Sequence, residues 1–395
     1  MKGTSQVLMV AGEPSGDLHA AHVAAALREM CPHLRLWGMG GMHMQKKGVE
    51  LLVDISGVSV VGISEVLSHL KAILTARRRL LRAVQDRNPS LAILVDFPDF
   101  NLWLARALRK RGIRILYYIA PQAWAWRRGR VRQMARLVER LAVILPFEEE
   151  FFCSGGVPAT YVGHPLLEEI PMENSRQQAM TDLGLNPQCT ILGLLPGSRS
   201  KEVERILPVM LEAARILTGK LHGLIPVVAL SPALELEPIR MRAQNICPGV
   251  RVIQGKAHDV LRVSTVAAVA SGTATLEAAL LGTPMVVVYK ASWVSYLLAR
   301  AMVKVKHVSL VNILAGHKVV PELIQKDFTT QRLADEISDL LEDPCRRTKM
   351  QEAMARLAQD LGTQRASINV ARMASEMLGR EPRLCSSLGS EGEKQ

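Results

Sequence analysis

The chain has 395 residues, of which 48% are hydrophobic and 4% aromatic, and its formal net charge is +12. This length suits two domains that each bury a core, and the hydrophobic content excludes intrinsic disorder. The excess of cations predicts an anionic partner, which is a nucleic acid, a phosphorylated substrate or an acidic membrane surface.

Short apolar runs alternate with helical segments through the first part of the chain, as βαβ units require. The strands expected there are Gln6–Ala11, Leu34–Gly38, Leu91–Val95, Ile113–Ile119, Leu141–Leu145 and Thr160–Gly163. The polar, proline-containing stretch 174–187 then interrupts the alternation. A domain boundary is therefore expected near residues 165–188.

The alternation restarts beyond this stretch. The strands expected there are Thr190–Leu195, Leu224–Leu230, Arg251–Ile253, Val266–Ala270 and Met285–Tyr289. We predict two α/β domains, residues 1–170 and 171–362, then a C-terminal helix at 363–380 that packs on the first domain or on a partner, and a disordered tail at 381–395. Because ligands bind beyond the carboxyl ends of parallel strands, the cleft between the domains is the expected site.

The first expected strand ends in a glycine turn, Gly12-Glu-Pro-Ser-Gly-Asp-Leu-His19, at the start of a helix. This turn is not G-x-G-x-x-G, so it does not support a dinucleotide site. Glu13 and Asp17 are candidate catalytic carboxylates, and Ser15 is a candidate substrate contact.

The expected strand Leu91–Val95 is followed directly by Asp96. A carboxylate at the end of a buried parallel strand points into the cleft, where desolvation raises its pKa toward that of a useful base. Asp99 is expected to cap the next helix instead. His164, at the domain junction, is a candidate for a catalytic or substrate-binding role.

In the second half, the strand Thr190–Leu195 ends in Pro196-Gly-Ser-Arg-Ser200. Pro-Gly forces a tight turn, Ser198 is expected to cap the following helix, and Arg199 brings a planar double donor to the positive end of that helix. This junction is therefore a candidate phosphate site.

A second junction of this kind is Ser271-Gly-Thr-Ala-Thr-Leu-Glu277, between two buried strands and at the start of a helix that ends near Leu281. Its unpaired backbone N–H groups attract phosphate, and Glu277, one turn in, can accept hydrogen bonds from a ribose diol. Any α/β crossover has such a junction, so the simpler interpretation is an ordinary connection between a strand and a helix that binds no nucleotide. Two of them with an added cation suit a nucleoside diphosphate.

Eight motifs follow one another along the chain: Val10-Ala-Gly-Glu-Pro-Ser-Gly-Asp17, Asp96-Phe-Pro-Asp-Phe-Asn101, Pro121-Gln-Ala-Trp-Ala-Trp-Arg127, Leu145-Pro-Phe-Glu148, Gly163-His-Pro165, Leu195-Pro-Gly-Ser-Arg199, Ser271-Gly-Thr-Ala-Thr-Leu-Glu277 and Ser309-Leu-Val-Asn-Ile-Leu-Ala-Gly316. In these motifs and their order, the chain resembles the lipid-A-disaccharide synthase family over roughly residues 6 to 375. One departure is Ala123, where the family commonly has Val.

The resemblance implies a GT-B fold, with two Rossmann-like parallel-sheet domains facing a cleft. The first would hold the acceptor and contact the membrane, and the second would bind the nucleotide sugar. The implied enzyme is an inverting hexosyltransferase of lipopolysaccharide biosynthesis. It joins UDP-2,3-diacylglucosamine to 2,3-diacylglucosamine 1-phosphate (lipid X) through a β-1,6 bond and releases UDP. No cofactor is expected, and no metal either, since the chain contains no D-x-D motif.

The resemblance also assigns roles to residues. It places the essential acid at Asp96 and the diphosphate contact at Arg199, beside Ser198. The base remains open among Asp96, Asp17 and Glu13. The uridine and ribose contacts it implies are Ser271, Gly272, Thr273, Glu277 and Asn312.

Lipid substrates imply a peripheral contact with an acidic membrane surface. The apolar candidates are Val60, Val61, Ile63, Leu67, Ile73 and Leu74, followed by Arg77, Arg78 and Arg79, and a second candidate segment runs from Trp293 to Lys306. The apolar stripe of the first segment also suits an ordinary core helix. Arg127, Arg128, Arg130, Arg132, Arg136 and Arg140 suit either lipid headgroups or a solvated helix face.

Six scattered cysteines without a C-x-x-C pair indicate a reducing compartment rather than a zinc or disulfide site. We therefore expect a cytoplasmic protein attached peripherally to the inner membrane, without a signal peptide or a bilayer span. The resemblance suggests a homodimer that exchanges C-terminal segments.

Two other functions stay open. One is another GT-B enzyme acting on UDP-N-acetylglucosamine, either a transferase or a 2-epimerase. The other is a non-enzymatic basic protein that binds membranes or nucleic acid. Low aromatic content and the lack of an RNA-stacking motif argue against nucleic acid.

Overall fold

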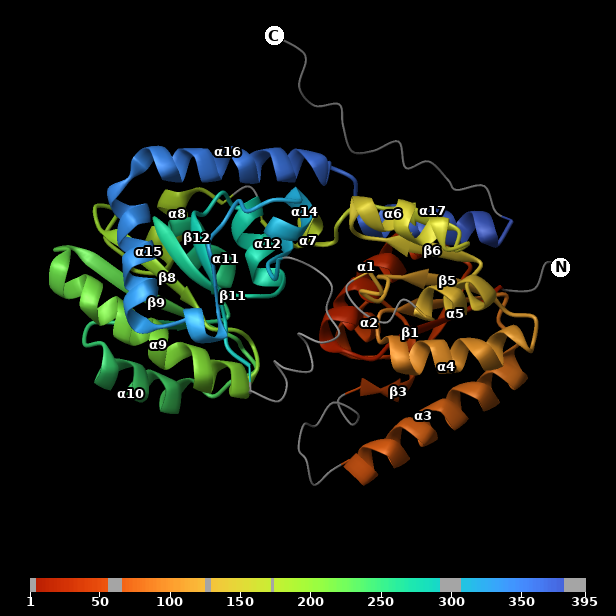
Figure 1. The fold of residues 1–395 in the computed structure, drawn as a ribbon. Coiled ribbons are helices and arrows are strands. Elements are labelled where there is room, and N and C mark those ends of the chain that lie inside the picture. The colour runs from red at the N-terminus through yellow and green to blue at the C-terminus, as the bar shows by residue number, and fades with distance from the viewer. Residues whose placement is uncertain (1–4, 56–65, 125–128, 172–173, 292–306, 380–395) are drawn as a thin grey trace, which may run out of the picture. The chain divides into compact units, whose positions relative to one another are not determined.

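The computed structural model describes residues 5–55, 66–124, 129–171, 174–291 and 307–379. The chain divides into two compact units. The first comprises Met1–Glu168 with Thr363–Gln395, and the second comprises Glu169–Gly362. Each unit is built on its own parallel sheet (Figure 1).

The sheet of the first unit has seven strands in the order β3-β2-β1-β4-β5-β6-β7, all paired in parallel. The strands are β1 (Gln6–Ala11), β2 (Arg35–Gly40), β3 (Glu50–Asp54), β4 (Leu91–Val95), β5 (Arg114–Tyr118), β6 (Arg140–Val143) and β7 (Ala159–Tyr161). The connecting helices are α1 (Pro14–Met30), α2 (Met42–Lys46), α3 (Val66–Arg87), α4 (Pro98–Arg109), α5 (Gly129–Leu137), α6 (Pro146–Ser154) and α7 (Leu166–Glu169).

Helices cover both faces of this sheet. Successive residues of each strand point to opposite faces, so each strand contributes apolar side chains to two cores. Leu8 and Val10 of β1 enter a core shared with α3, α4 and α5. Val7, Met9 and Ala11 enter a second core, shared with α1 and with α17 (Ala366–Met377). The C-terminal helix thus returns to the first unit and packs against α1 (Figure 1).

The sheet of the second unit has six strands in the order β10-β9-β8-β11-β12-β13, again parallel. The strands are β8 (Thr190–Leu195), β9 (Leu224–Leu230), β10 (Arg251–Gln254), β11 (Val266–Ala270), β12 (Met285–Tyr289) and β13 (Glu322–Ile324). Helix α9 packs beside α10 and α15, and α11 packs beside α8 and α12. The helices are α8 (Arg176–Asp182), α9 (Ser200–Lys220), α10 (Leu236–Ile246), α11 (Ala257–Val263), α12 (Thr273–Leu280), α14 (Leu310–Ala315), α15 (Thr330–Glu342) and α16 (Pro344–Asp360), with a 3-10 turn, η3 (Gln325–Asp327).

The two parallel α/β sheets confirm the fold class predicted from the alternating pattern. Every expected strand is present, six of them with the same bounds and the others within two residues. Strands β3 and β13, which lie at sheet edges, were not predicted from the sequence. Both are short and carry carboxylates, Glu50 and Asp54 in one and Glu322 in the other, so they lack the apolar run that marks the central strands.

Candidate active site

Asp96 lies in a strained turn at the carboxyl end of β4, beside the end of β1. Asp96 and Phe97 have φ angles of 45° and 46°, in the left-handed region that non-glycine residues rarely adopt. The backbone of Asp96 is held by three hydrogen bonds. Its N–H donates to Tyr118 O at 2.9 Å, and its carbonyl accepts from Tyr117 Oη and Asn101 Nδ2, both at 2.7 Å. Strain that neighbours hold in this way is typical of functional sites.

The pKa of Asp96 is raised to about 6. Burial is the main cause, and the like charge of Glu13 adds to it, while the Phe97 N–H and His19 act in the opposite direction. A carboxylate with this pKa is mostly ionised at neutral pH yet basic enough to accept a proton, as expected for a strand-end base.

The turn after β1 lies so close to the turn after β4 that a side chain at position 12 would not fit, and glycine occupies this position. A Cβ on Gly12 would lie 2.1 Å from the ring of Phe97, so any other residue would displace that ring. Glu13 then occupies the N-cap position of α1, and both Glu13 and Ser15 are exposed. These two residues and Asp96 are thus presented at neighbouring strand ends.

Asp17 has a different environment from the other candidate bases. Its side chain is buried, and it accepts hydrogen bonds from the backbone N–H groups of Gly41 at 2.7 Å, His43 at 3.0 Å and Met44 at 3.2 Å. It therefore caps the start of α2, which argues for a structural role and leaves Asp96 and Glu13 as the stronger candidate bases. Asp99, expected as a helix cap, instead lies in the first turn of α4, where Phe97 holds the N-cap position, and pairs with Arg130.

His164 is buried, and its Nδ1 accepts a hydrogen bond from Leu166 N at 3.2 Å. The preceding Gly163 has a φ of 98°, and a Cβ there would lie 2.5 Å from Gln364 O. The turn carrying His164 is thus packed against the segment that leads into α17.

Two sequence motifs of the first unit are joined by a buried carboxyl group. Glu148 in α6 accepts hydrogen bonds from Trp124 Nε1 at 3.0 Å and from Leu145 N at 3.2 Å. Burial raises the pKa of Glu148 to about 7. Nothing in the sequence indicated this pairing, because it depends on how α6 packs against the segment after β5.

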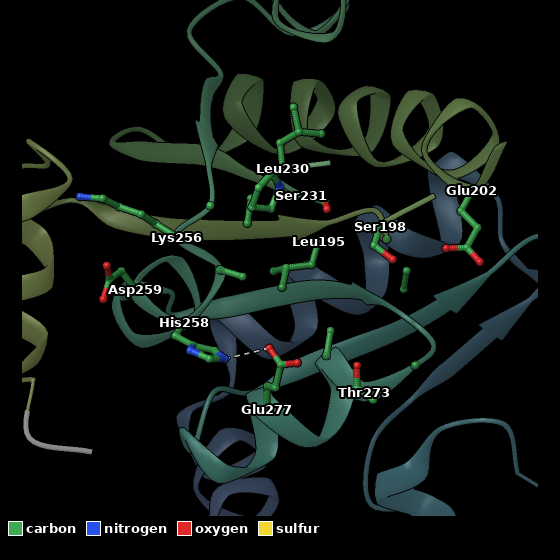
Figure 2. Close-up of a pocket in the computed structure, with 18 of the residues that line it drawn as sticks. Leu195, Ser198, Glu202, Leu230, Ser231, Lys256, His258, Asp259, Thr273 and Glu277 are labelled. Atoms are coloured by element: carbon green, nitrogen blue, oxygen red, sulfur yellow. Dashed lines mark hydrogen bonds and ion pairs between the residues drawn. The ribbon is translucent and has the colours of Figure 1, made fainter. Parts of the chain in front are cut away.

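In the second unit, the predicted nucleotide residues from two strand ends line one cavity of about 650 Å³ (Figure 2). The predicted residues among its walls are Ser198, Arg199, Ser271, Gly272, Thr273 and Glu277. The cavity also meets the ends of β9 and β10, which contribute Ser231, Lys256 and His258. These three residues were not predicted from the sequence, although they follow predicted strands and ligands bind beyond the carboxyl ends of parallel strands.

The N-terminus of α9 opens into this cavity. Arg199, not Ser198, occupies the N-cap position, and no side chain caps this helix end, which corrects the expected role of Ser198. The Arg199 side chain is 80% exposed and lies 3.4 Å from Glu202, a distance too long for a strong ion pair. The guanidinium is therefore available to an anion beside the uncapped helix end.

The N-terminus of α12 opens into the same cavity, with Gly272 at its N-cap position and no side-chain cap. The Ser271 hydroxyl donates to Val308 O at 3.0 Å, so it also holds the segment before α14. Two helix ends of the same polarity therefore meet at one cavity, an arrangement that favours a doubly charged diphosphate.

Asn312 is fully buried, and protein groups occupy its side-chain amide. Its Nδ2 donates to Val320 O and Glu322 Oε1, while its Oδ1 accepts from the N–H groups of Val319 and Val320. This leaves the amide little capacity for a uridine contact, and Asn312 is not among the residues that line the cavity. Its evident role is to tie α14 to the segment before β13.

The candidate membrane residues are only partly described. Val60, Val61, Ile63 and the segment Trp293–Lys306 lie outside the described residues, and Leu67 lies in α3 without a described side chain. Ile73 packs against the core shared with α3, which fits the core alternative at this position. In the described parts of the chain, every helix is too short or too polar to cross a bilayer.

Some of the candidate membrane-binding arginines interact with other side chains of the protein, some are exposed, and some lie outside the described residues. The Arg77 guanidinium lies 3.9 Å from the centre of the Trp103 ring, so it is engaged within the protein, while Arg78 and Arg79 are exposed. Arg127 and Arg128 lie outside the described residues. Arg130 pairs with Asp99 and Arg140 with Glu376, and Arg132 and Arg136 are exposed.

A family model described as lipid-A-disaccharide synthetase matches residues 7–377. The lipid-A-disaccharide synthase of Syntrophus aciditrophicus is 47% identical over 376 residues, 94% of this chain and 97% of that protein. That of Myxococcus xanthus is 44% identical, covering 96% and 99%. The structure of the UDP-GlcNAc 2-epimerase from Neisseria meningitidis bound to UDP-GlcNAc has a TM-score of 0.63 at 14% identity, covering 94% of this chain and 99% of that one, which is a likeness of fold alone.

Proposed function

The chain belongs to the lipid-A-disaccharide synthase family, and from this membership we propose how its residues carry out the reaction. The enzyme is a hexosyltransferase of the GT-B fold. It joins UDP-2,3-diacylglucosamine to 2,3-diacylglucosamine 1-phosphate through a β-1,6 bond. The observation that carries the assignment of sites is the cavity in which two helix N-termini, Arg199 and Glu277 meet.

The cavity of the second unit would hold the UDP part of the donor. The diphosphate would lie at the uncapped starts of α9 and α12, with Arg199 and the Ser198 hydroxyl as donors. Glu277 would accept hydrogen bonds from the ribose hydroxyls, and Ser271, Gly272 and Thr273 would contact the rest of the nucleotide through backbone and hydroxyl groups. We assign Asn312 an indirect role, because its amide is occupied within the protein.

The strand ends of the first unit would hold the acceptor. Asp96 would take the proton from the acceptor 6-hydroxyl as that oxygen attacks the anomeric carbon of the donor. The bond from this carbon to the diphosphate oxygen breaks in the same step, and UDP leaves with the electron pair. One in-line displacement of an α-linked sugar inverts the centre and gives the β-glycoside. Arg199 and the helix ends would stabilise the charge that develops on UDP. Ser15 and His164 are further candidate contacts to the acceptor.

Exchange of Glu13 for Gln should move the acid limb of the pH profile to lower pH. Activity requires the Asp96 carboxylate, so in the wild-type enzyme kcat/KM should rise with pH through about 6, the pKa of Asp96. The Glu13 charge contributes to that raised pKa, and its removal should lower the pKa while burial keeps it above the ordinary value. The measurement is kcat/KM against pH for both enzymes. Loss of activity at every pH, with no shift of the limb, would identify Glu13 itself as the base.

We also propose that the enzyme is cytoplasmic and attached peripherally to the inner membrane. Serine at Val60, Val61 and Ile63 together should release protein from vesicles containing anionic lipid even at low salt, because apolar burial at about 25 cal/mol per Å² is not screened. Gln at Arg78 and Arg79 should weaken attachment mainly at low salt, since about 0.1 M salt screens exposed charges about 10 Å apart. Vesicle co-sedimentation and thermal melts measure both effects. If the serine variant unfolds, or stays bound as the wild type does, apolar insertion by this segment is refuted.

The resemblance to the family further implies a homodimer with exchanged C-terminal segments, which we retain as a proposal. The segment concerned is α17, and its packing against α1 within one chain is the contact that an exchange would reproduce between two chains.

The function itself is tested by release of UDP in the presence and absence of acceptor. A transferase should release UDP at a substantial rate when both diacylated sugars are present and much more slowly with the donor alone. An enzyme that converts UDP-N-acetylglucosamine to its 2-epimer without any acceptor would instead support the alternative function.

A further inference from the structure

His258 meets Glu277 at the wall of the nucleotide cavity. His258 is the second residue of α11, and Glu277 is the fifth residue of α12, a neighbouring helix. The imidazole Nε2 lies 3.1 Å from Glu277 Oε2, and both residues line the cavity (Figure 2). The family motifs in the sequence include Glu277 but not His258, so this pairing arises from the packing of the two helices.

The His258–Glu277 pair is mostly buried, but it borders the cavity. The side chains of His258 and Glu277 are 28% and 16% exposed, so water screens their interaction less than it screens a surface ion pair. The second carboxylate oxygen, Oε1, points away from the imidazole (Figure 2). Within the described parts of the chain, the hydrogen bond seen for this carboxylate is the one to His258. Glu277 is thus fixed by one oxygen and presents the other.

The charges around the imidazole favour its protonated form. The pKa of His258 is raised, chiefly by the hydrogen bond to Glu277, with further contributions from the charges of Glu277, Glu169 and Asp259, while burial acts against it. The ammonium of Lys256, just before α11, donates to Asp182 O at 3.3 Å. An ionised carboxylate can only accept hydrogen bonds, so the imidazole Nε2–H donates to Glu277.

A glutamate side chain that is free to move loses rotamer entropy when it binds a ligand, and this loss reduces the affinity for the ligand. A partner that already holds the carboxylate in place removes much of that cost. We propose that His258 is a positioning residue for nucleotide recognition, because it holds Glu277 with one oxygen directed at the ribose hydroxyls of UDP. This inference deepens the proposed function and rests on the ribose contact assigned to Glu277.

The test compares the binding of UDP and of 2′-deoxy-UDP by calorimetry. The wild type should prefer UDP by about tenfold, the effect of one hydrogen bond to a charged group. His258→Phe, which keeps a planar aromatic ring but has no hydrogen-bond donor, should weaken UDP binding about fivefold or more and largely abolish the preference for UDP. His258→Gln, whose amide reaches the position of Nε2, should retain the preference for UDP.

Two controls accompany these variants. In Glu277→Gln, the further change His258→Phe should have no added effect on UDP binding. His222→Phe, at an exposed histidine outside the cavity, is the matched control.

The outcomes separate this inference from the proposed function. If His258→Phe is folded by thermal melt and keeps the wild-type preference for UDP, His258 does not position Glu277. If His258→Gln weakens UDP binding as much as His258→Phe does, a hydrogen-bond donor at this position does not position Glu277, and the inference is again wrong. If the wild type binds UDP and 2′-deoxy-UDP equally, the ribose contact itself fails, and this inference fails with it.

Discussion

Asp96→Asn is expected to lower kcat by about 10²- to 10⁴-fold, the usual contribution of a general base, and to leave UDP affinity almost unchanged. The amide has nearly the shape of the carboxylate but cannot accept the proton of the acceptor hydroxyl. The three hydrogen bonds that hold this strained turn involve the Asp96 backbone, so the variant should keep the turn. Steady-state kinetics at saturating substrate and calorimetry with UDP measure the two quantities.

The matched control for this variant is Asp99→Asn, in the next turn of the same segment. The Asp99 side chain is 83% exposed and pairs with Arg130, so its replacement should leave most of the activity. Retention of more than about a tenth of wild-type kcat by Asp96→Asn would show that Asp96 is not the base, given the usual size of this effect. Glu13 would then be the next candidate, because Asp17 is committed to three backbone N–H groups.

Arg199→Ala is expected to weaken UDP binding by roughly 1.5–3 kcal/mol, the range for a hydrogen bond to a charged group. The same change should weaken pyrophosphate binding, because Arg199 would contact the diphosphate. The side chain is mostly exposed and makes a long contact to Glu202, so the free energy of unfolding should change little. Calorimetry with both ligands provides the measurement.

Two variants make this result specific. Arg205→Ala, at an exposed position one to two turns further along α9, should bind UDP as the wild type does. Glu277→Gln should weaken UDP binding, because hydrogen bonds from the ribose hydroxyls to a charged carboxylate are stronger than those to a neutral amide. It should leave pyrophosphate binding unchanged, because pyrophosphate has no ribose. Equal UDP affinity in Arg199→Ala and the wild type would refute the diphosphate assignment.

Much of the fold was predictable because the central strands are continuous apolar runs bounded by turn residues. Runs such as Leu91–Val95 and Val266–Ala270 are buried on both faces, so their periodicity leaves few alternatives. The edge strands β3 and β13 were missed because an edge needs fewer apolar residues and tolerates Glu50 or Glu322.

The residues at the nucleotide cavity were predictable where a strand meets a long helix, because the topology alone brings such junctions to one edge. The partners of individual side chains were not. Asp17 caps α2, which is 24 to 27 residues away in sequence, and Asn312 bonds to the segment before β13. His258 reaches Glu277 through the packing of α11 against α12, which no local pattern in the sequence records.

The most direct test of the account is the identity of the product formed from the two diacylated sugars. The purified protein should convert UDP-2,3-diacylglucosamine and 2,3-diacylglucosamine 1-phosphate into a species whose mass is the sum of the two less UDP. NMR of this product should show a β linkage to the 6-oxygen of the acceptor. A product of donor hydrolysis alone, or an α linkage, would contradict the single in-line displacement assigned to this enzyme.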